Sequence, residues 1–184
     1  MKKHIAELRI LQAAEYAADK HRFQRRKDKA ATPYINHPLS VAFRLAAAGE
    51  SDAMVLMAAL LHDTIEDTNT SYDDLKEKFG IEVADVVLEL TDDKHLSKEE
   101  RKRRQVDLAA GKSLAARKVK LADKICNVND ILHHPPDDWS VEEKVRYILW
   151  SKAVVDNMRG SQPVLEQEFD ELFLQCRTEF KFDY

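Results

Sequence analysis

Two histidines and two aspartates stand where their side chains could hold a metal ion. The pair His62-Asp63 ends one run of apolar residues, and Asp123 interrupts another. A charged side chain in such a run costs free energy unless a partner compensates it, and a bound cation is one such partner. His37 follows Pro33 closely, at the expected start of a helix. These four side chains form a candidate metal site.

The donor types point to a catalytic ion. Two imidazoles and two carboxylates suit a borderline-to-hard divalent ion such as Mn²⁺ or Fe²⁺. Four protein ligands on an octahedral ion leave room for water and substrate, and water held by such an ion can be ionised near neutral pH. Each of these residues alone is more often an ordinary core or surface residue, so the prediction rests on the set.

Two further carboxylates, Glu66 and Asp67, come one helical turn after the histidine–aspartate pair. If the helix continues, Glu66 lies over His62 and Asp67 over Asp63. Carboxylates placed there could orient or deprotonate an attacking water. The alternative is that they are simply charged residues at a helix end that faces solvent. Negative charge at a helix C-terminus is unfavourable, which favours a functional role.

Basic side chains flank these candidates and could bind an anionic ligand. Arginine suits bidentate phosphate contacts and lysine suits point-charge contacts, but we expect most of them to be solvated. They form two clusters: Arg22, Arg25, Arg26 and Lys27, and then Lys94, Lys98, Arg101 and Lys102. Asn127, one turn after Asp123, either faces the same pocket or occupies an ordinary polar surface position.

Helices must position these side chains, because apolar residues recur at helical spacing along most of the chain. The 4 glycines and 5 prolines among 184 residues are few, as in helical proteins. We expect Ser51 to cap one helix, and Ser97 with Glu100 and Ser140 with Glu143 to form capping boxes. The expected helices cover about 5–18, 38–49, 53–61, 71–80, 81–90, 98–110, 114–131, 141–159 and 163–180, with loops at 27–36, 64–71, 91–97 and 132–139.

Composition predicts one all-α domain over residues 1–184, built from about eight to ten helices. With 44% hydrophobic and 34% charged residues, the chain has the make-up of a soluble globular protein. A net charge of −4 argues against a dedicated nucleic-acid binder but allows an anionic small ligand. Without a membrane-spanning run or signal peptide, we expect a cytoplasmic protein with no membrane partner. Cys126 and Cys176 fall in helical patterns and are expected to be buried free thiols.

Four motifs together resemble the hydrolase domain of RelA/SpoT proteins, and in particular the stand-alone small alarmone hydrolases that include the metazoan SpoT homologue. The likeness continues through residues 90–94 and the helix at 139–140, so it covers most of the chain. The motifs are Gln24-Arg25-Arg26-Lys27-Asp28, Thr32-Pro33-Tyr34-Ile35-Asn36-His37-Pro38, His62-Asp63-Thr64-Ile65-Glu66-Asp67-Thr68 and Val119-Lys120-Leu121-Ala122-Asp123-Lys124.

This resemblance implies an HD-domain helical bundle that hydrolyses ppGpp and pppGpp at the 3′ position with Mn²⁺, giving GDP or GTP and pyrophosphate. The implied metal ligands are His37, His62, Asp63 and Asp123, and the implied catalytic carboxylates are Glu66 and Asp67. The implied substrate-binding residues are Arg26, Lys27, Asn127, Lys98 and Tyr147. Related bifunctional enzymes carry synthetase and regulatory domains after the hydrolase. We expect neither here, and therefore an enzyme that only degrades.

One departure leaves the substrate open. The family usually has arginine where Asn129 stands, so the nucleotide could be a guanosine alarmone, an adenosine alarmone or NADPH losing its 2′-phosphate. Two other interpretations are an HD nucleotidase of another branch, against which Glu66-Asp67 argues, and a non-catalytic nucleotide-binding module, against which the complete ligand set argues. The protein could also form a homo-oligomer, since nothing in the sequence determines its oligomeric state.

Overall fold

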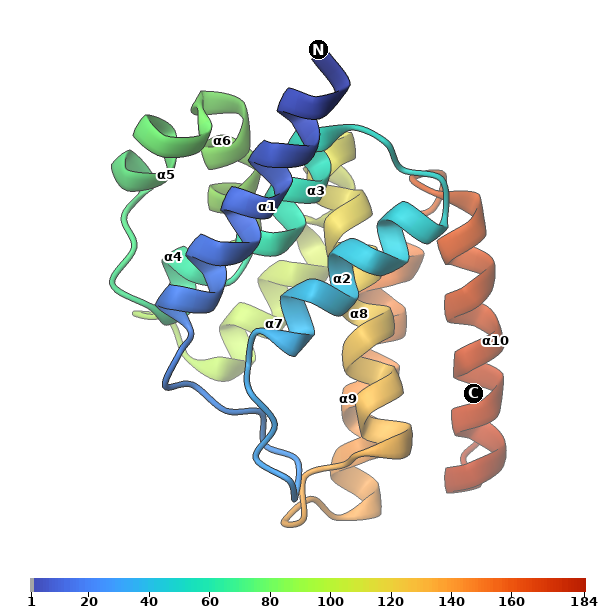
Figure 1. The fold of residues 1–184 in the computed structure, drawn as a ribbon. Coiled ribbons are helices and arrows are strands. Elements are labelled where there is room, and N and C mark those ends of the chain that lie inside the picture. The colour runs from blue at the N-terminus through green and yellow to red at the C-terminus, as the bar shows by residue number, and fades with distance from the viewer. Residues whose placement is uncertain (1) are drawn as a thin grey trace.

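The computed structural model describes residues 2–184, which form helices α1 to α10 and one short 3-10 helix, η1 (Figure 1). Their bounds are α1 Lys2–Lys20, α2 Asn36–Ala47, α3 Ala53–Leu61, α4 Thr64–Asp67, α5 Tyr72–Phe79, α6 Ile81–Leu90, α7 Lys98–Asp107, η1 Ala109–Gly111, α8 Leu114–His133, α9 Val141–Asp156 and α10 Pro163–Phe180. Within residues 2–184 the only β-type pairings are two isolated bridges, Arg25 with Pro33 and Asp28 with Pro136. The predicted all-α fold of about eight to ten helices is confirmed.

Serine side chains cap the starts of α7 and α9, as predicted. The Ser140–Glu143 pair forms the expected capping box at the start of α9, with both reciprocal hydrogen bonds present. At α7 only half of the expected box forms, because Ser97 accepts from the Glu100 N–H without a return bond. One such accepted bond still satisfies one of the free N–H groups of the helix start.

Two expectations about the α3–α4 region are wrong. The N-cap of α3 is Asp52, whose Oδ1 accepts from the Met54 N–H at 2.9 Å, and not Ser51. The expected loop at 64–71 begins with the short helix α4, because the Asp67 N–H bonds to the Asp63 carbonyl at 2.8 Å and closes one more turn. Helix α3 itself ends at Leu61, so α4 is a new helix after a turn at His62 and Asp63.

Helices α3 and α8 form the interior of the bundle. Helix α3 is apolar throughout and packs against α1, α2, α6 and α8, which surround it in Figure 1. Helix α8 is also largely buried, yet it carries Asp123 and two lysines, Lys120 and Lys124, into this interior. Buried charges need partners, so polar chemistry is concentrated where α8 meets the end of α3. No helix among residues 2–184 is both long and apolar enough to cross a bilayer.

Two loops meet at one end of the bundle and border the site. One connects α1 to α2 and the other connects α8 to α9, and both lie at the lower end of the molecule in Figure 1. The Asp28–Pro136 bridge joins them. Ala31, in the first loop, has a positive φ of 47°, which a non-glycine residue rarely adopts. The Asp28–Pro136 bridge thus joins two loops that are far apart in the sequence.

Candidate active site

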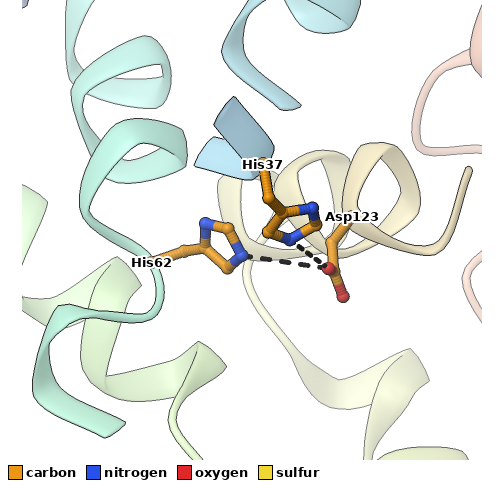
Figure 2. A group of neighbouring side chains, drawn as sticks. All are labelled: His37, His62 and Asp123. Atoms are coloured by element: carbon orange, nitrogen blue, oxygen red, sulfur yellow. Dashed lines mark hydrogen bonds and ion pairs between the residues drawn. The ribbon is translucent and has the colours of Figure 1, made fainter. Parts of the chain in front are cut away.

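Three helical segments bring His37, His62 and Asp123 together, as Figure 2 shows. His37 comes from the first turn of α2, His62 follows the end of α3, and Asp123 lies in the middle of α8. One ligand atom from each lies within 4.8 Å of the other two, and all three residues are buried. The Nε2 atom of His37 is 3.1 Å from Asp123 Oδ1, and that of His62 is 3.8 Å from it. Three of the four predicted ligands therefore lie together.

Asp63, the fourth predicted ligand, lies beside the cluster. Its Oδ2 is 3.0 Å from His62 Nε2 and 3.8 Å from His37 Nε2. The Tyr34 hydroxyl donates to the same oxygen at 2.6 Å. Burial, together with Asp63, raises the pKa of Tyr34 well above its ordinary value, so Tyr34 remains a hydrogen-bond donor.

The donors of this cluster fit a divalent cation. His62 Nδ1 donates to the Ala59 carbonyl at 2.8 Å, which fixes the tautomer that leaves Nε2 facing the aspartates. That Nε2 is buried and has no hydrogen-bond partner, since its contact with Asp63 is not aligned for a hydrogen bond. In its deprotonated form this nitrogen is a buried acceptor without a donor, which is costly, and a metal ion would satisfy it. Two imidazoles and two carboxylates are a donor set that borderline and hard divalent ions accept.

The ionisable groups of the cluster compensate one another. Burial alone would lower the pKa of His62, but Asp63 and Asp123 raise it to about 9. For His37, burial outweighs Asp123, and its pKa falls below the ordinary value. Burial would raise the pKa of both aspartates, yet His62 next to Asp63 and Lys124 next to Asp123 hold these pKa values well below their usual range. Both carboxylates are therefore ionised. In the metal-free protein a proton on His62 supplies the positive charge that a bound cation would otherwise supply.

We expect the affinity of the metal-free protein for Mn²⁺ to rise as the pH approaches about 9. The titrating proton sits on His62 Nε2, because Nδ1 donates to Ala59, and it must leave before that nitrogen can coordinate an ion. Binding at neutral pH should release roughly one proton per ion. Calorimetry in buffers of different ionisation enthalpy measures that proton. An affinity that is constant between about pH 7 and pH 8.5 would contradict this assignment.

Asp67 lies in the wall of the adjoining cavity, where two donors hold it. Its Oδ2 accepts from Gln24 Nε2 at 3.1 Å, and its Oδ1 accepts from Lys94 Nζ at 2.7 Å. Each carboxylate oxygen therefore accepts one hydrogen bond and can still accept another.

Glu66 is not among the residues that line the cavity, and it contacts the segment that connects α6 to α7. Its Oε2 accepts from the Asp92 N–H at 3.0 Å. Burial raises the pKa of the Glu66 carboxyl, and the charges of Asp92 and Asp63 raise it further, although the Asp92 N–H acts in the opposite direction. A carboxyl with a raised pKa beside a candidate metal site is suited to accept and return a proton. We predicted that Glu66 lies over His62 on one continuous helix. This prediction is wrong, because α3 ends at Leu61 and Glu66 belongs to the separate helix α4.

A cavity of about 780 Å³ opens beside the cluster. Of the predicted substrate-binding residues, four line it: Arg26, Lys27, Asn127 and Tyr147. Lys98 is exposed at the start of α7 and is not among the lining residues. Asn129 does not line the cavity either. It follows Asn127 by two residues on the same helix, and residues at that spacing lie on different faces.

Arg26 is connected to the metal cluster through Asn127. The Arg26 guanidinium donates to Asp130 Oδ2 at 2.6 Å and to Asn127 Oδ1 at 3.1 Å. Asn127 in turn donates to Asp123 Oδ1 at 2.6 Å. The guanidinium also lies 5.6 Å from the centroid of the Tyr34 ring. The cationic edge of the cavity is thus linked to a candidate metal ligand by hydrogen bonds.

Comparisons with known proteins agree with this geometry. The HD-domain family model matches residues 13–151. The chain is 47% identical to the Drosophila melanogaster protein named guanosine-3′,5′-bis(diphosphate) 3′-pyrophosphohydrolase MESH1, over 91% of this chain and 94% of the relative. It is 48% identical to the Homo sapiens MESH1 protein of the same name, over 90% and 93%. The chain belongs to the MESH1 family of HD-domain proteins. A solved structure of a metazoan SpoT orthologue, described as hydrolysing ppGpp, is 47% identical and superposes with a TM-score of 0.88, over 91% of this chain and 94% of that one.

In this MESH1-family chain, some cavity residues were not predicted from the sequence as site residues. They are Gln24, Tyr34, Asp130, His134 and Trp139. Asp130 had a usable signal, since it follows Asp123 by seven residues and Asn127 by three on one helix, and therefore shares their face. Gln24 and Tyr34 had none beyond the family likeness, because a loop path determined by tertiary contacts brings them to the site.

Proposed function

We propose that this protein is an Mn²⁺-dependent 3′-pyrophosphohydrolase that converts ppGpp to GDP and pyrophosphate, and pppGpp to GTP and pyrophosphate. The observation that carries the proposal is a buried cluster of two histidines and one aspartate, with the half-buried Asp63 beside it, next to a cavity of about 780 Å³ that Asp67 also lines. The relatives that carry this activity in their names match nearly the whole chain at 47% and 48% identity, which supports the same substrate.

His37, His62, Asp63 and Asp123 would hold the ion. A divalent ion there supplies Lewis-acid stabilisation of negative charge on phosphoryl oxygens and makes water easier to ionise. In the net reaction the oxygen of water bonds to phosphorus and the bond from phosphorus to the ribose 3′ oxygen breaks. Pyrophosphate leaves, and the 3′ oxygen takes up a proton to become a hydroxyl.

Glu66 and Asp67 are the residues we assign to water. Glu66 combines a raised pKa with a place beside Asp63, so it can accept the proton of the attacking water and return it later. Asp67, on the cavity wall where Gln24 donates to it, can orient the water through a hydrogen bond.

The cavity residues would contact the nucleotide. Arg26 and Lys27 place positive charge on its lining, Asn127 connects Arg26 to Asp123, and Tyr147 also lines the cavity. Basic groups there offset the charge of the diphosphates. Lys98 would reach only a phosphate that projects out of the cavity towards α7.

The direct test mixes metal-free protein with ppGpp, ppApp or NADPH, with and without Mn²⁺, and separates products by anion exchange. We expect GDP and pyrophosphate from ppGpp only when Mn²⁺ is present. Cleavage of ppApp or NADPH alone would keep the site and change the substrate. Absence of turnover by protein shown to bind Mn²⁺ would contradict the proposal.

A further inference from the structure

Gln24 connects a buried histidine to the carboxylate of Asp67. Its Nε2 donates to Asp67 Oδ2 at 3.1 Å, and its Oε1 lies 2.6 Å from His21 Nδ1. A carboxylate only accepts hydrogen bonds, so the NH₂ end of the amide must face Asp67. The amide oxygen then faces His21 and accepts from an Nδ1–H. Both the orientation of the Gln24 amide and the tautomer of His21 follow from this pairing.

His21, which contacts that amide, is buried and fixed in position. The residue is 2% exposed and continues directly from α1, with its backbone N–H bonded to the Ala17 carbonyl at 2.9 Å. Its ring packs against Tyr34 at 4.9 Å between centroids, and Tyr34 donates to the candidate ligand Asp63. One buried imidazole therefore contacts two side chains, Gln24 and Tyr34, each of which holds a different carboxylate of the site.

The backbone of Gln24 is held as well. Its N–H bonds to the His21 carbonyl at 2.9 Å, and its carbonyl accepts from the Tyr34 N–H at 3.1 Å. The side chain is half-buried. Little conformational entropy remains to be lost when Gln24 binds Asp67, because main-chain and side-chain contacts already fix it.

Lys94 provides the comparison, because it is the second donor to the same carboxylate. Its Nζ contacts the other oxygen of Asp67, but 52% of its side chain is exposed, on the segment between α6 and α7. An exposed ion pair is screened by salt and typically contributes little to holding a side chain in one place. Of the two donors, Gln24 is the one with a fixed position.

We propose that Gln24, held by His21, is a positioning residue that fixes Asp67 on the cavity wall in the orientation needed for catalysis. The proposal rests on the proposed function only for the role of Asp67, since the contacts themselves do not depend on a substrate. A misplaced catalytic group reduces turnover, whereas nucleotide binding through Arg26 and Asn127 is left intact.

The kinetic test compares Gln24→Glu, Gln24→Ala and Lys94→Ala. Glutamate keeps the shape of glutamine and still accepts from His21, but it presents a carboxylate to Asp67. We expect Gln24→Glu to lower kcat roughly 100-fold and Gln24→Ala roughly 10-fold, with KM within about 3-fold of wild type. Lys94→Ala is the matched control. Its kcat should stay within about 3-fold of the wild-type value, and this small difference from wild type should vanish at about 0.5 M salt. If Gln24 only fills space, Gln24→Glu will be the most active of the Gln24 variants, and the proposal is wrong.

A second readout needs no turnover. The side-chain amide resonances of Gln24 should shift in Asp67→Ala and remain in place in Lys94→Ala, with Mn²⁺ binding and Tm recorded for every variant. Amide resonances indifferent to Asp67→Ala would overturn the proposal. If the wild-type protein does not cleave ppGpp, the proposed function fails, and the resonances still decide whether Gln24 holds Asp67.

Discussion

Replacing Glu66 by glutamine and Asp67 by asparagine together is expected to lower kcat for ppGpp by at least about 1,000-fold while Mn²⁺ stays bound. Both changes keep the shape of the side chain and remove its ability to take a proton. The amide oxygen of the introduced glutamine can still accept from the Asp92 N–H, so the local fold is kept. Neither residue belongs to the cluster of His37, His62 and Asp123, so the ion should remain.

The measurement is release of GDP under saturating ppGpp, with bound manganese determined on the same samples. Asp73→Asn with Glu77→Gln is the matched control, because it removes two negative charges from exposed positions of α5. That control should keep wild-type turnover. Wild-type turnover by the Glu66→Gln, Asp67→Asn variant would remove both residues from the chemistry and leave the metal site alone as the source of catalysis.

The candidate metal ligands could be singled out from sequence because their signal is local. His62, Asp63 and Asp123 interrupt apolar runs, and a polar group in the interior demands a partner whatever the details of packing. The helices could be predicted for the same reason, since periodicity and caps act within a few residues. The end of α10 and the limits of α6 agree with the expected ranges, whereas α8 extends to His133 and α9 stops at Asp156. Helix ends depend on the last hydrogen bonds, which composition does not determine.

The arrangement around the ligands could not be predicted, because it depends on turns and on contacts between distant segments. The chain turns at His62 and Asp63, so Glu66 and Asp67 lie on the separate helix α4 and face different partners. The family likeness suggested Lys98 as a substrate contact, yet the start of α7 leaves it exposed. Gln24 reaches Asp67 across 43 residues of sequence, along a loop whose path no local pattern encodes.

Removing the metal is expected to abolish turnover and to lower the stability of the fold. An ion that binds only the folded protein stabilises it by about 4 kcal/mol when its concentration is 1,000 times its Kd. At roughly 2–4 °C per kcal/mol for a domain of this size, Mn²⁺ should raise Tm by about 8–16 °C. The buried Nε2 of His62 is the reason to expect a large effect, because the ion satisfies the deprotonated nitrogen, to which no group of the protein donates a hydrogen bond.

His62→Gln locates the source of that stabilisation. The variant lacks the buried imidazole nitrogen, so it should show neither turnover nor an Mn²⁺-dependent rise in Tm. His95→Gln makes the same chemical change at an exposed position between α6 and α7 and should behave as wild type in both measurements. Scanning calorimetry of the three proteins with EDTA and with Mn²⁺ gives the comparison. If the rise in Tm persists in His62→Gln, the ion binds elsewhere. If the rise disappears while turnover remains, the ion stabilises the fold without taking part in the reaction.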